Sequence, residues 1–374
     1  MTHRHPAQVG MSIEEIETPA LIVDLDTVER NLKTLADALD GTGVVHRAHA
    51  KMHKCPALAK LQIAQGAVGV CCQKVSEAEA MVEGGIDNVL VTNEIVDPRK
   101  IERLADLATR ASVAVCVDNP LNVPVLNEAA HKFGIMLPVL VEINVGANRA
   151  GVEPGRAALE LAQAVDSMDG LRFAGLQAYH GSAQHKRKPE ERKAAIDGAV
   201  AATRQTRDLL MQHGLACDMI TGGGTGTYRH EAASDLYTEI QAGSYVFMDA
   251  DYAKNIGDNG KPFAEFEHAL FIYATVMSTS IPGQALIDVG HKAQSSDSGP
   301  PVVYDMPGAE FVKASDEHGV LKLSESAPNL IIGDKIKLIP GHIDPTCNLH
   351  EYYVVLRGDI VEALWPITAK GPGL

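Results

Sequence analysis

Short apolar runs recur along the first two thirds of the chain, and stretches with the pattern of amphipathic helices lie between them. Most runs are rich in Val, Ile, Leu or Cys, which is typical of strands buried on both faces of a parallel sheet. Eight strands with intervening helices over this length predict a closed (β/α)8 barrel, and a doubly wound open sheet is the competing topology. The eight runs are 44–50, 67–75, 88–94, 112–119, 137–145, 173–180, 218–225 and 239–245.

The pattern changes after about residue 255, where strand-like runs are separated by turns with little helical sequence between them. Runs such as FIYATVMS, KIKLI and YYVVL are typical of antiparallel strands. We therefore predict a (β/α)8 barrel at residues 24–255 and an antiparallel β domain at residues 256–374. Residues 12–23 are expected to join the β domain.

Composition and charge restrict the class of partner. The formal net charge of -15 argues against nucleic acid or an anionic membrane surface, because both repel an acidic protein. No apolar run approaches the roughly 20 residues of a membrane-spanning helix, and the N-terminal stretch lacks the apolar core of a secretory signal. The six cysteines are scattered without a disulfide-like spacing, so we expect reduced thiols in a cytoplasmic protein. With nucleic acid and membranes disfavoured, the expected partner is a small-molecule substrate.

Lys51 directly follows the first apolar run, in the stretch VVHRAHAKMHKCP. If the strand continues, His49 and Lys51 share one of its faces. A lysine that is desolvated at the rim of a barrel has a lowered pKa, and its neutral amine can bond covalently to a carbonyl group. A solvent-exposed lysine at the end of a strand is the alternative interpretation.

A glycine-rich stretch, ITGGGTGTY at residues 220–228, follows the seventh run. Consecutive glycines allow several backbone N–H groups to point at one anion, and barrels bind phosphate near the ends of strands seven and eight. The expected contributors are Thr221, Gly223 and Gly224, with Ser244 and Tyr245 at the end of the eighth run. A flexible turn is the alternative, but a phosphate site combined with Lys51 predicts a pyridoxal 5'-phosphate site.

The stretch GHIDPTCNLH at residues 341–350 contains metal-ligand side chains. On a strand, His342 and Asp344 would point the same way and offer one nitrogen and one oxygen to an ion. This sparse set suits Mn²⁺ or Mg²⁺ with open positions for substrate. A zinc site that uses Cys347 and His350 and a simple turn at Asp344 remain as alternatives.

Three further candidate residues lie at the end of the sixth run or shortly after it, in the stretch QAYHGSAQHKRKPEER. Tyr179, His180 and His185 would face a cofactor at the barrel rim, where an imidazole can act as a general base. A histidine held by structural hydrogen bonds is the alternative for each imidazole.

These motifs together resemble a known family. RAHAKMHK, GVCCQKVSEAEA, VTNEIV, TGGGTG, DEHG and GHIDPTCNLH are similar to motifs of the metal-activated, pyridoxal-phosphate-dependent D-threonine aldolases and of their relatives, the 3-hydroxyaspartate aldolases. The resemblance covers essentially the whole chain. It implies an alanine-racemase-type fold, with a (β/α)8 barrel and a C-terminal β domain, and a head-to-tail homodimer.

The resemblance also implies roles for individual residues. Lys51 should carry the cofactor, and His185 should take the proton from the substrate's β-hydroxyl group. His342 and Asp344 should hold a divalent metal ion that binds this hydroxyl. His180 and Asp316 are expected at the substrate, with Asp316 contributed by the partner subunit. The remaining cofactor-binding residues are expected to be Gln73, Arg149, Tyr179, Thr221, Gly223, Gly224, Ser244 and Tyr245.

The expected activity is retro-aldol cleavage of D-3-hydroxy-α-amino acids to glycine and an aldehyde. A 3-hydroxyaspartate aldolase, which would release glyoxylate, is the first alternative, and the stretch KAQSSDSGPP resembles that branch. A lyase similar to D-serine dehydratase is less favoured, because such relatives tend to carry H-x-C where this chain has His342 and Asp344. A cofactor-carrying regulatory protein would share the barrel but usually lacks the second domain.

Overall fold

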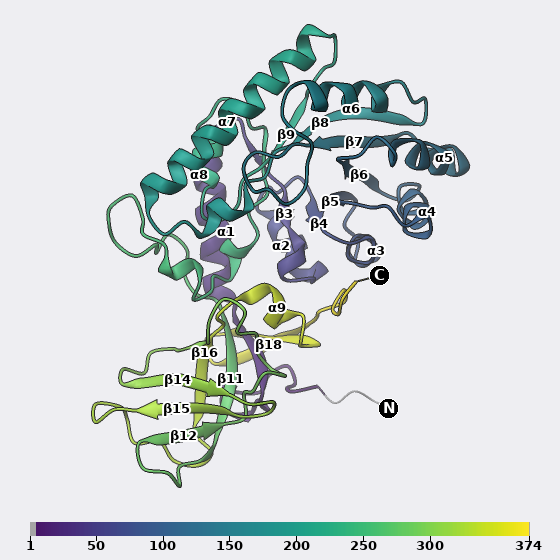
Figure 1. Cartoon of the computed structure of the whole chain (residues 1–374). Coiled ribbons are helices and arrows are strands. Elements are labelled where there is room, and N and C mark those ends of the chain that lie inside the picture. Colours follow the sequence, from purple (N-terminus) through teal and green to yellow (C-terminus); the bar gives the residue numbers. More distant parts are fainter. Residues whose placement is uncertain (1–4, 374) are drawn as a thin grey trace. The chain divides into compact units, whose positions relative to one another are not determined.

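The computed structural model describes residues 5–373. Residues 1–4 of the N-terminal stretch and residue 374 of the expected β domain lie outside the described residues. The chain divides into two compact units, which are drawn in Figure 1. The β unit contains the chain up to Thr34, Ser244–Lys254 and Lys261–Gly371, and the barrel unit contains Leu35–Gly243, Asn255–Gly260 and the chain from Pro372.

The barrel unit is built on one parallel sheet of nine strands, in the order β2-β10-β9-β8-β7-β6-β5-β4-β3. Their positions agree with the eight apolar runs, although most strands are shorter than the runs. The strands are β2 (Val45–His46), β3 (Ala48–His49), β4 (Val70–Cys72), β5 (Asn88–Glu94), β6 (Ser112–Val117), β7 (Leu137–Glu142), β8 (Leu171–Gln177), β9 (Met219–Gly222) and β10 (Glu239–Ile240).

The two ends of this sheet belong to the same stretch of chain. β2 pairs with β10 and β3 pairs with β4, and the single residue Arg47 separates β2 from β3. The Arg47 guanidinium forms a buried ion pair with Glu239 of β10, with 2.7 Å between Nη2 and Oε2. The first expected strand is therefore divided into two short halves that close the sheet, and the predicted barrel is confirmed.

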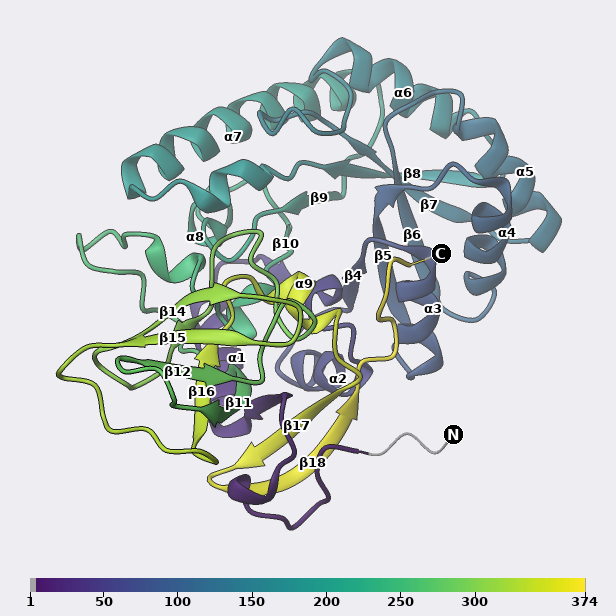
Figure 2. The same ribbon diagram turned by 60° about the horizontal axis from the view of Figure 1, so that its bottom comes forward.

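Helices alternate with the strands, and Figure 2 shows α3 to α7 around the outside of β4 to β9. Local sequence explains their ends. At α4, Asp97 caps the first turn by accepting hydrogen bonds from the N–H groups of Arg99 and Lys100, and α5 ends at Gly134 in a left-handed conformation. The helices are α1 (Leu25–Leu39), α2 (Pro56–Ala64), α3 (Val75–Glu83), α4 (Pro98–Leu107), α5 (Val123–Phe133), α6 (Arg156–Asp166), α7 (Pro189–Gln212) and α8 (Tyr228–Ala232).

The strand side chains divide between two cores. Small and medium apolar side chains from successive strands, including Cys71, Leu90, Cys116 and Leu140, form a separate buried cluster. Their neighbours along each strand belong instead to the large core that includes the helices. Burial raises the pKa of the Cys71 and Cys116 thiols well above the ordinary value, so these cysteines are inert packing groups.

The β unit contains a second sheet with nine strands, mostly antiparallel. The N-terminal strand β1 lies within it, antiparallel to β11 and parallel to β17. Its strands are β1 (Ala20–Asp24), β11 (Leu270–Ser278), β12 (Gln284–Ile287), β13 (Val302–Val303), β14 (Ala309–Ala314), β15 (Gly319–Leu323), β16 (Lys335–Ile339), β17 (Tyr352–Arg357) and β18 (Ile360–Pro366).

Three elements of the β unit differ from the sequence prediction. The sequence predicts neither the two-residue strand β13 nor β14, in which only Phe311 of six residues is buried and no apolar alternation occurs. The short helix α9 (Ile343–Cys347) replaces the expected strand at His342, and five residues are too few for a helical period to appear in the sequence. Within residues 5–373, no helix has the length and apolar character that crossing a bilayer requires.

Candidate active site

Lys51 lies directly after β3, in the 3-10 helix η2 (Ala50–Met52), and its side chain is half-buried. The strand ends at His49, so the expectation that His49 and Lys51 share one strand face is wrong. A strand of two residues cannot continue here, because the backbone turns to begin η2. The lysine nevertheless lies at the carboxyl end of a barrel strand, where such folds place their reactive groups.

His49 is the common neighbour of several predicted site residues. Its Nε2 lies 3.1 Å from Nε2 of Gln73 and 3.3 Å from Oγ1 of Thr92. Burial lowers the pKa of His49 well below its ordinary value, and the positive charges of Lys51 and Arg149 lower it further. The imidazole is therefore neutral, and Lys51, Gln73 and Arg149 are its neighbours.

Arg149 and Tyr179 also lie together, with the guanidinium carbon 5.9 Å from the centre of the tyrosine ring. The guanidinium Nη2 is 4.0 Å from Oε1 of the buried Glu142 at the end of β7. Burial, followed by the charge of Glu94, raises the pKa of Glu142 to about 8. Glu142 and Glu94 therefore retain a shared proton at neutral pH, and neither carboxylate was predicted from the sequence.

The two candidate histidines have different surroundings. His180 is buried, its Nδ1 lies 3.3 Å from Oγ of Ser182, and burial lowers the pKa of its imidazole. A Cβ atom on Gly146 would come within 2.7 Å of Nε2 of His180, so this ring is tightly packed. His185 ends the 3-10 helix η3 (Gly181–His185) and is exposed. Of these two imidazoles, the His185 ring is the more accessible one.

The glycine-rich loop after β9 has the properties of an anion site. Gly223 has a φ of +71°, and a Cβ atom on Gly224 would lie 2.7 Å from Oε1 of Gln184, so neither position tolerates a side chain. The N–H groups of Gly223 and Gly224 donate to no other residue within 5–373. Two adjacent donors in a glycine loop fit the phosphate of pyridoxal 5'-phosphate. Thr221 is buried and accepts a hydrogen bond of 2.8 Å from Nε2 of Gln241.

Other predicted residues belong to the β unit. Ser244 and Tyr245 lie in the 3-10 helix η4 (Ser244–Val246), and the buried Tyr245 ring packs edge-on against Phe266. Asp316 is exposed between β14 and β15, and its carbonyl oxygen accepts a hydrogen bond of 3.1 Å from N of Lys292.

His342 and Asp344 are brought together by α9 and not by a strand. His342 is the residue before the helix and Asp344 lies in its first turn, with 3.9 Å between Nε2 and Oδ1. His342 Nδ1 lies 2.8 Å from Oδ2 of Asp297. Burial disfavours protonation of His342, but the charges of Asp344 and Asp297 outweigh it and raise its pKa. A nitrogen and a carboxylate oxygen that face each other, with the second ring nitrogen held by an acid, fit a divalent ion.

The alternative zinc ligands do not form such a site. Cys347 is buried and its pKa is raised to about 12, mainly by burial, whereas a zinc ligand must be a thiolate. His350 Nε2 lies 2.8 Å from the carbonyl oxygen of Ala293. No group of three or more His, Cys, Asp and Glu side chains suitable for a metal ion occurs within residues 5–373.

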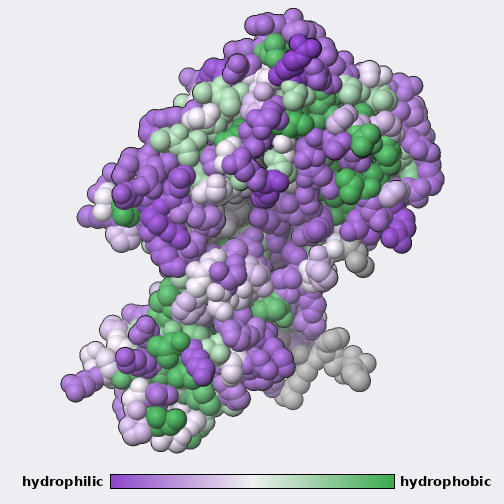
Figure 3. Space-filling model, in the orientation of Figure 1, coloured by the Kyte–Doolittle hydropathy of each residue, from purple (hydrophilic) through white to green (hydrophobic). Residues whose placement is uncertain are grey.

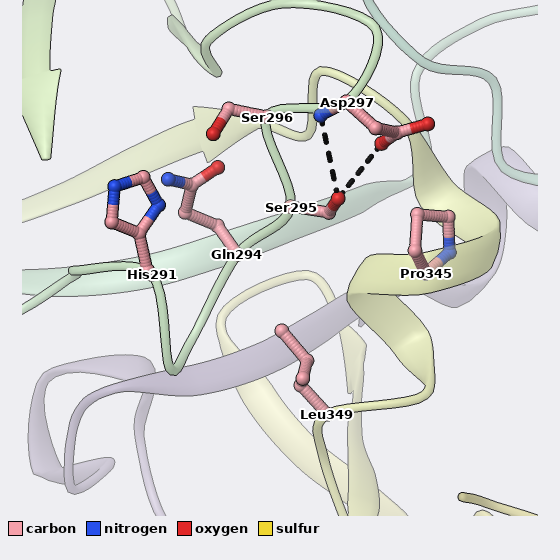
Figure 4. Close-up of a pocket in the computed structure, with 7 residues that line it drawn as sticks. All are labelled: His291, Gln294, Ser295, Ser296, Asp297, Pro345 and Leu349. Atoms are coloured by element: carbon pink, nitrogen blue, oxygen red, sulfur yellow. Dashed lines mark hydrogen bonds between the residues drawn. The ribbon is translucent and has the colours of Figure 1, made fainter. Parts of the chain in front are cut away.

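A pocket of about 360 Å³ lies beside Asp297 in the β unit and is drawn in Figure 4. Gln294 lines this pocket and is 1% exposed, yet its Oε1 and Nε2 have no hydrogen-bond partner among the described residues. Figure 4 shows the Gln294 carboxamide turned toward the side where the His291 imidazole lies. The pocket is lined by His291, Gln294, Ser295, Ser296, Asp297, Pro345 and Leu349.

Comparison with known proteins agrees with this architecture. Residues 23–251 match the family described as alanine racemase, N-terminal domain, and residues 269–356 match a domain family named for serine dehydratase. A 3-hydroxy-D-aspartate aldolase of Paracoccus denitrificans (strain Pd 1222) is 48% identical over 98% of this chain and 96% of its own length. A D-threonine aldolase of Arthrobacter sp is 44% identical over 98% of this chain and 96% of its own length.

A solved structure is similarly close. The crystal structure of D-threonine aldolase from Filomicrobium marinum has a TM-score of 0.95 and 50% sequence identity, over 98% of this chain and 99% of that chain. The sequence motifs assign no role to Glu94, Glu142 and Gln184. Glu94 lies within VTNEIV and Gln184 within QAYHGSAQH, but only the contacts of these side chains in the barrel indicate what they do.

Proposed function

The chain belongs to the alanine racemase N-terminal domain family, in the group with the D-threonine aldolases and 3-hydroxy-D-aspartate aldolases, and we propose that it cleaves D-3-hydroxy-α-amino acids to glycine and an aldehyde. The observation that carries the proposal is the pair of N–H groups at Gly223 and Gly224, which donate to no other described residue, in a barrel that places Lys51 at a strand end. Together they fit a cofactor with one phosphate and one carbonyl carbon.

Each predicted cofactor-binding residue then has a chemical role. The Lys51 amine would hold pyridoxal 5'-phosphate, which supplies an acceptor for the electron pair of the broken Cα–Cβ bond. Gly223 and Gly224 would bind its phosphate, with Thr221, Ser244 and Tyr245 as further contributors. Gln73, Arg149 and Tyr179 would surround its ring, which the proximity of Gln73 and Arg149 to His49, and of Tyr179 to Arg149, supports.

His185 would remove the proton from the β-hydroxyl group of the substrate. The C–O bond becomes a carbonyl as the Cα–Cβ bond breaks, so the aldehyde leaves, and Cα then takes a proton to give glycine. The exposure of His185 supports this role, and the tight packing of His180 supports a contact with substrate that orients it without proton transfer.

His342 and Asp344 would hold a divalent ion, Mn²⁺ or Mg²⁺. Such an ion supplies Lewis acidity that lowers the pKa of a hydroxyl group bound to it. The contact between His342 and Asp297 supports this assignment, because ligating histidines usually have their second nitrogen held by an acid or a carbonyl group.

A head-to-tail homodimer in the cytoplasm completes the proposal, with Asp316 reaching the site of the partner subunit. The β unit exposes apolar side chains that an interface could cover. Figure 3 shows hydrophobic patches (green) on the surface of this unit, at the bottom of the view. These exposed residues include Met277, Ile281, Val302, Ile331 and Ile332. The six free cysteines support a reducing compartment.

The pocket beside Asp297 favours a second candidate substrate, 3-hydroxyaspartate. Its β-carboxylate needs hydrogen-bond donors, and the unpartnered Gln294 carboxamide and the Ser296 hydroxyl are donors that line the pocket. A buried amide that is unsatisfied without ligand strongly prefers a substrate that pairs with it. Release of glyoxylate would then be the principal reaction.

The experiment is product analysis after incubation of the enzyme with D-threonine and, separately, with each isomer of 3-hydroxyaspartate, with Mn²⁺ and with a chelator. We expect glycine and the matching aldehyde in the presence of metal. Formation of 2-oxobutyrate from D-threonine, or of oxaloacetate from 3-hydroxyaspartate, with ammonia would indicate a dehydratase instead. In Gln294→Leu, a selective loss of 3-hydroxyaspartate cleavage would support the second candidate, and an equal loss on both substrates would contradict it.

A further inference from the structure

Two neighbouring residues of η3 have opposite environments. Gln184 is 1% exposed, whereas the adjacent His185 is exposed. A glutamine buried to this degree must satisfy three hydrogen-bonding sites on its side chain and has little freedom to move. Its partners therefore decide where the backbone of η3, and with it the His185 imidazole, can lie.

Those partners belong to the glycine-rich loop. Gln184 Oε1 accepts a hydrogen bond of 2.9 Å from N of Gly226, and Gln184 Nε2 donates one of 2.7 Å to Oγ1 of Thr227. Thr227 Oγ1 in turn donates a hydrogen bond of 2.8 Å to Oε1 of Glu231. The Gln184 backbone is held as well, since its carbonyl oxygen accepts a hydrogen bond of 2.9 Å from Nδ2 of Asn255.

The contact between η3 and the loop is also tight. Cβ atoms on Gly224 and Gly226 would lie 2.7 Å from Oε1 and 2.9 Å from the carbonyl oxygen of Gln184. A shift of the loop therefore moves Gln184 or breaks its hydrogen bonds. Gly224 is also one of the two glycines whose N–H groups donate to no other described residue, so the atoms that would hold an anion adjoin the glutamine.

We propose that Gln184 is a positioning residue that ties the His185 imidazole to the glycine-rich loop, so that a phosphate group bound in the loop sets the imidazole for proton transfer. The inference rests on the proposed function, in which the loop binds the cofactor phosphate and His185 is the base. The connecting chain is Gln184, Thr227 and Glu231, and each hydrogen bond orients the next donor.

The test separates the phosphate from the rest of the cofactor. The full-length enzyme is loaded with pyridoxal, which lacks the phosphate, and inorganic phosphate is then added. In the wild type we expect phosphate to raise kcat by about 10-fold to 100-fold, because a misplaced catalytic group costs rates of this order. In Gln184→Met, phosphate should bind with an affinity within a few-fold of the wild type, but the rise in kcat should be lost.

A second measurement does not depend on turnover. Diethyl pyrocarbonate modifies exposed imidazoles, and peptide mass spectrometry reports the modification rate at His185 alone. Inorganic phosphate should change this rate in the pyridoxal-loaded wild type and leave it unchanged in Gln184→Met. The control is Gln62→Met, which removes an equally buried carboxamide that contacts His53 in the barrel unit and should keep both phosphate effects.

Thr227→Val is the variant to test if Gln184→Met does not fold. It removes the middle of the chain and should weaken both phosphate effects, whereas the matched Thr206→Val removes a buried hydroxyl on α7 and should not. Equal phosphate effects in Gln184→Met and wild type would overturn the proposal, as would an absence of phosphate binding in the wild type. Failure of the wild type with pyridoxal 5'-phosphate to cleave any 3-hydroxy amino acid would contradict the proposed function itself.

Discussion

His342 Nδ1 lies 2.8 Å from Oδ2 of Asp297, so Nε2 is the ring nitrogen of His342 that faces Asp344. Asp297 in turn accepts a hydrogen bond of 2.7 Å from Oγ of Ser295, which keeps the carboxylate in place. The imidazole is thus oriented before any ligand arrives. This orientation requires a contact across 45 residues of sequence, and no spacing rule connects the two positions.

Asp297→Ala should weaken the binding of Mn²⁺ by about 10-fold to 100-fold, because the imidazole loses the group that orients it. Asp297→Asn should lose less Mn²⁺ affinity, since its amide oxygen can still accept a hydrogen bond from Nδ1 of His342. Calorimetric titration with Mn²⁺ measures both affinities. Equal Mn²⁺ affinity in Asp297→Ala and the wild type would show that the contact does not serve the metal.

Asp344→Ala should behave like the chelator-treated enzyme, with cleavage activity lost and the melting temperature nearly unchanged. One imidazole alone holds a weakly binding divalent ion poorly. Cys347→Ser is the comparison, since a zinc site at Cys347 and His350 would make chelation and this substitution lower the melting temperature. Unchanged cleavage by Asp344→Ala would exclude the metal assignment.

Lys51→Ala should abolish the visible absorbance of the bound cofactor and all turnover, because no other amine holds its carbonyl carbon. The control is Lys60→Ala, an exposed lysine on α2. Absorbance spectra after gel filtration measure retention of the cofactor. Visible absorbance that is retained by Lys51→Ala after gel filtration would contradict the assignment of Lys51.

His185→Asn should lose roughly 10²-fold to 10⁴-fold in kcat while retaining the cofactor, which is the usual contribution of a positioned acid or base. His180→Asn should instead lower stability, since its ring fills space against Gly146. Steady-state kinetics and melting temperatures distinguish the two variants. If His180→Asn shows the larger kinetic loss, the two roles are reversed.

Glu231 should make stability depend on pH. Burial raises the pKa of its carboxyl group from 4.5 to about 7, while the hydrogen bond from Thr227 lowers it slightly. The folded state therefore favours the neutral carboxyl group of Glu231. Its contribution to the free energy of unfolding is complete at pH values below the unfolded pKa, and it is lost as the pH rises through the folded pKa. The difference between the folded and the unfolded pKa corresponds to a loss of about 3 kcal/mol in the free energy of unfolding from low to high pH.

Glu231→Gln should therefore be more stable than the wild type above about pH 8 and no more stable below about pH 5. Thermal unfolding across this range is the measurement. The glutamine retains the acceptor for Thr227, and the nearby Tyr237 hydroxyl has its pKa raised by burial and by the charge of Glu231. A constant difference in melting temperature at all pH values would contradict the titration of Glu231.

Periodicity was sufficient to predict the architecture. Eight nearly continuous apolar runs with helices between them can satisfy their backbone and bury both faces only in a parallel sheet, and this number favours closure. The residues at the ends of these runs could therefore be predicted to lie at the carboxyl-terminal rim of the barrel. The glycine-rich stretch and Lys51 were identifiable for the same reason, since each follows a strand directly.

Tertiary structure decided the rest, because short elements and long-range contacts leave no periodic signal. The division of the first strand at Arg47 depends on its ion pair with Glu239, 192 residues away. The meeting of His342 with Asp344 required one turn of helix, which i, i+2 spacing on a strand did not predict. Gln184 precedes His185 in the stretch QAYHGSAQH, but only the fold turns its side chain onto the glycine-rich loop while it leaves His185 exposed.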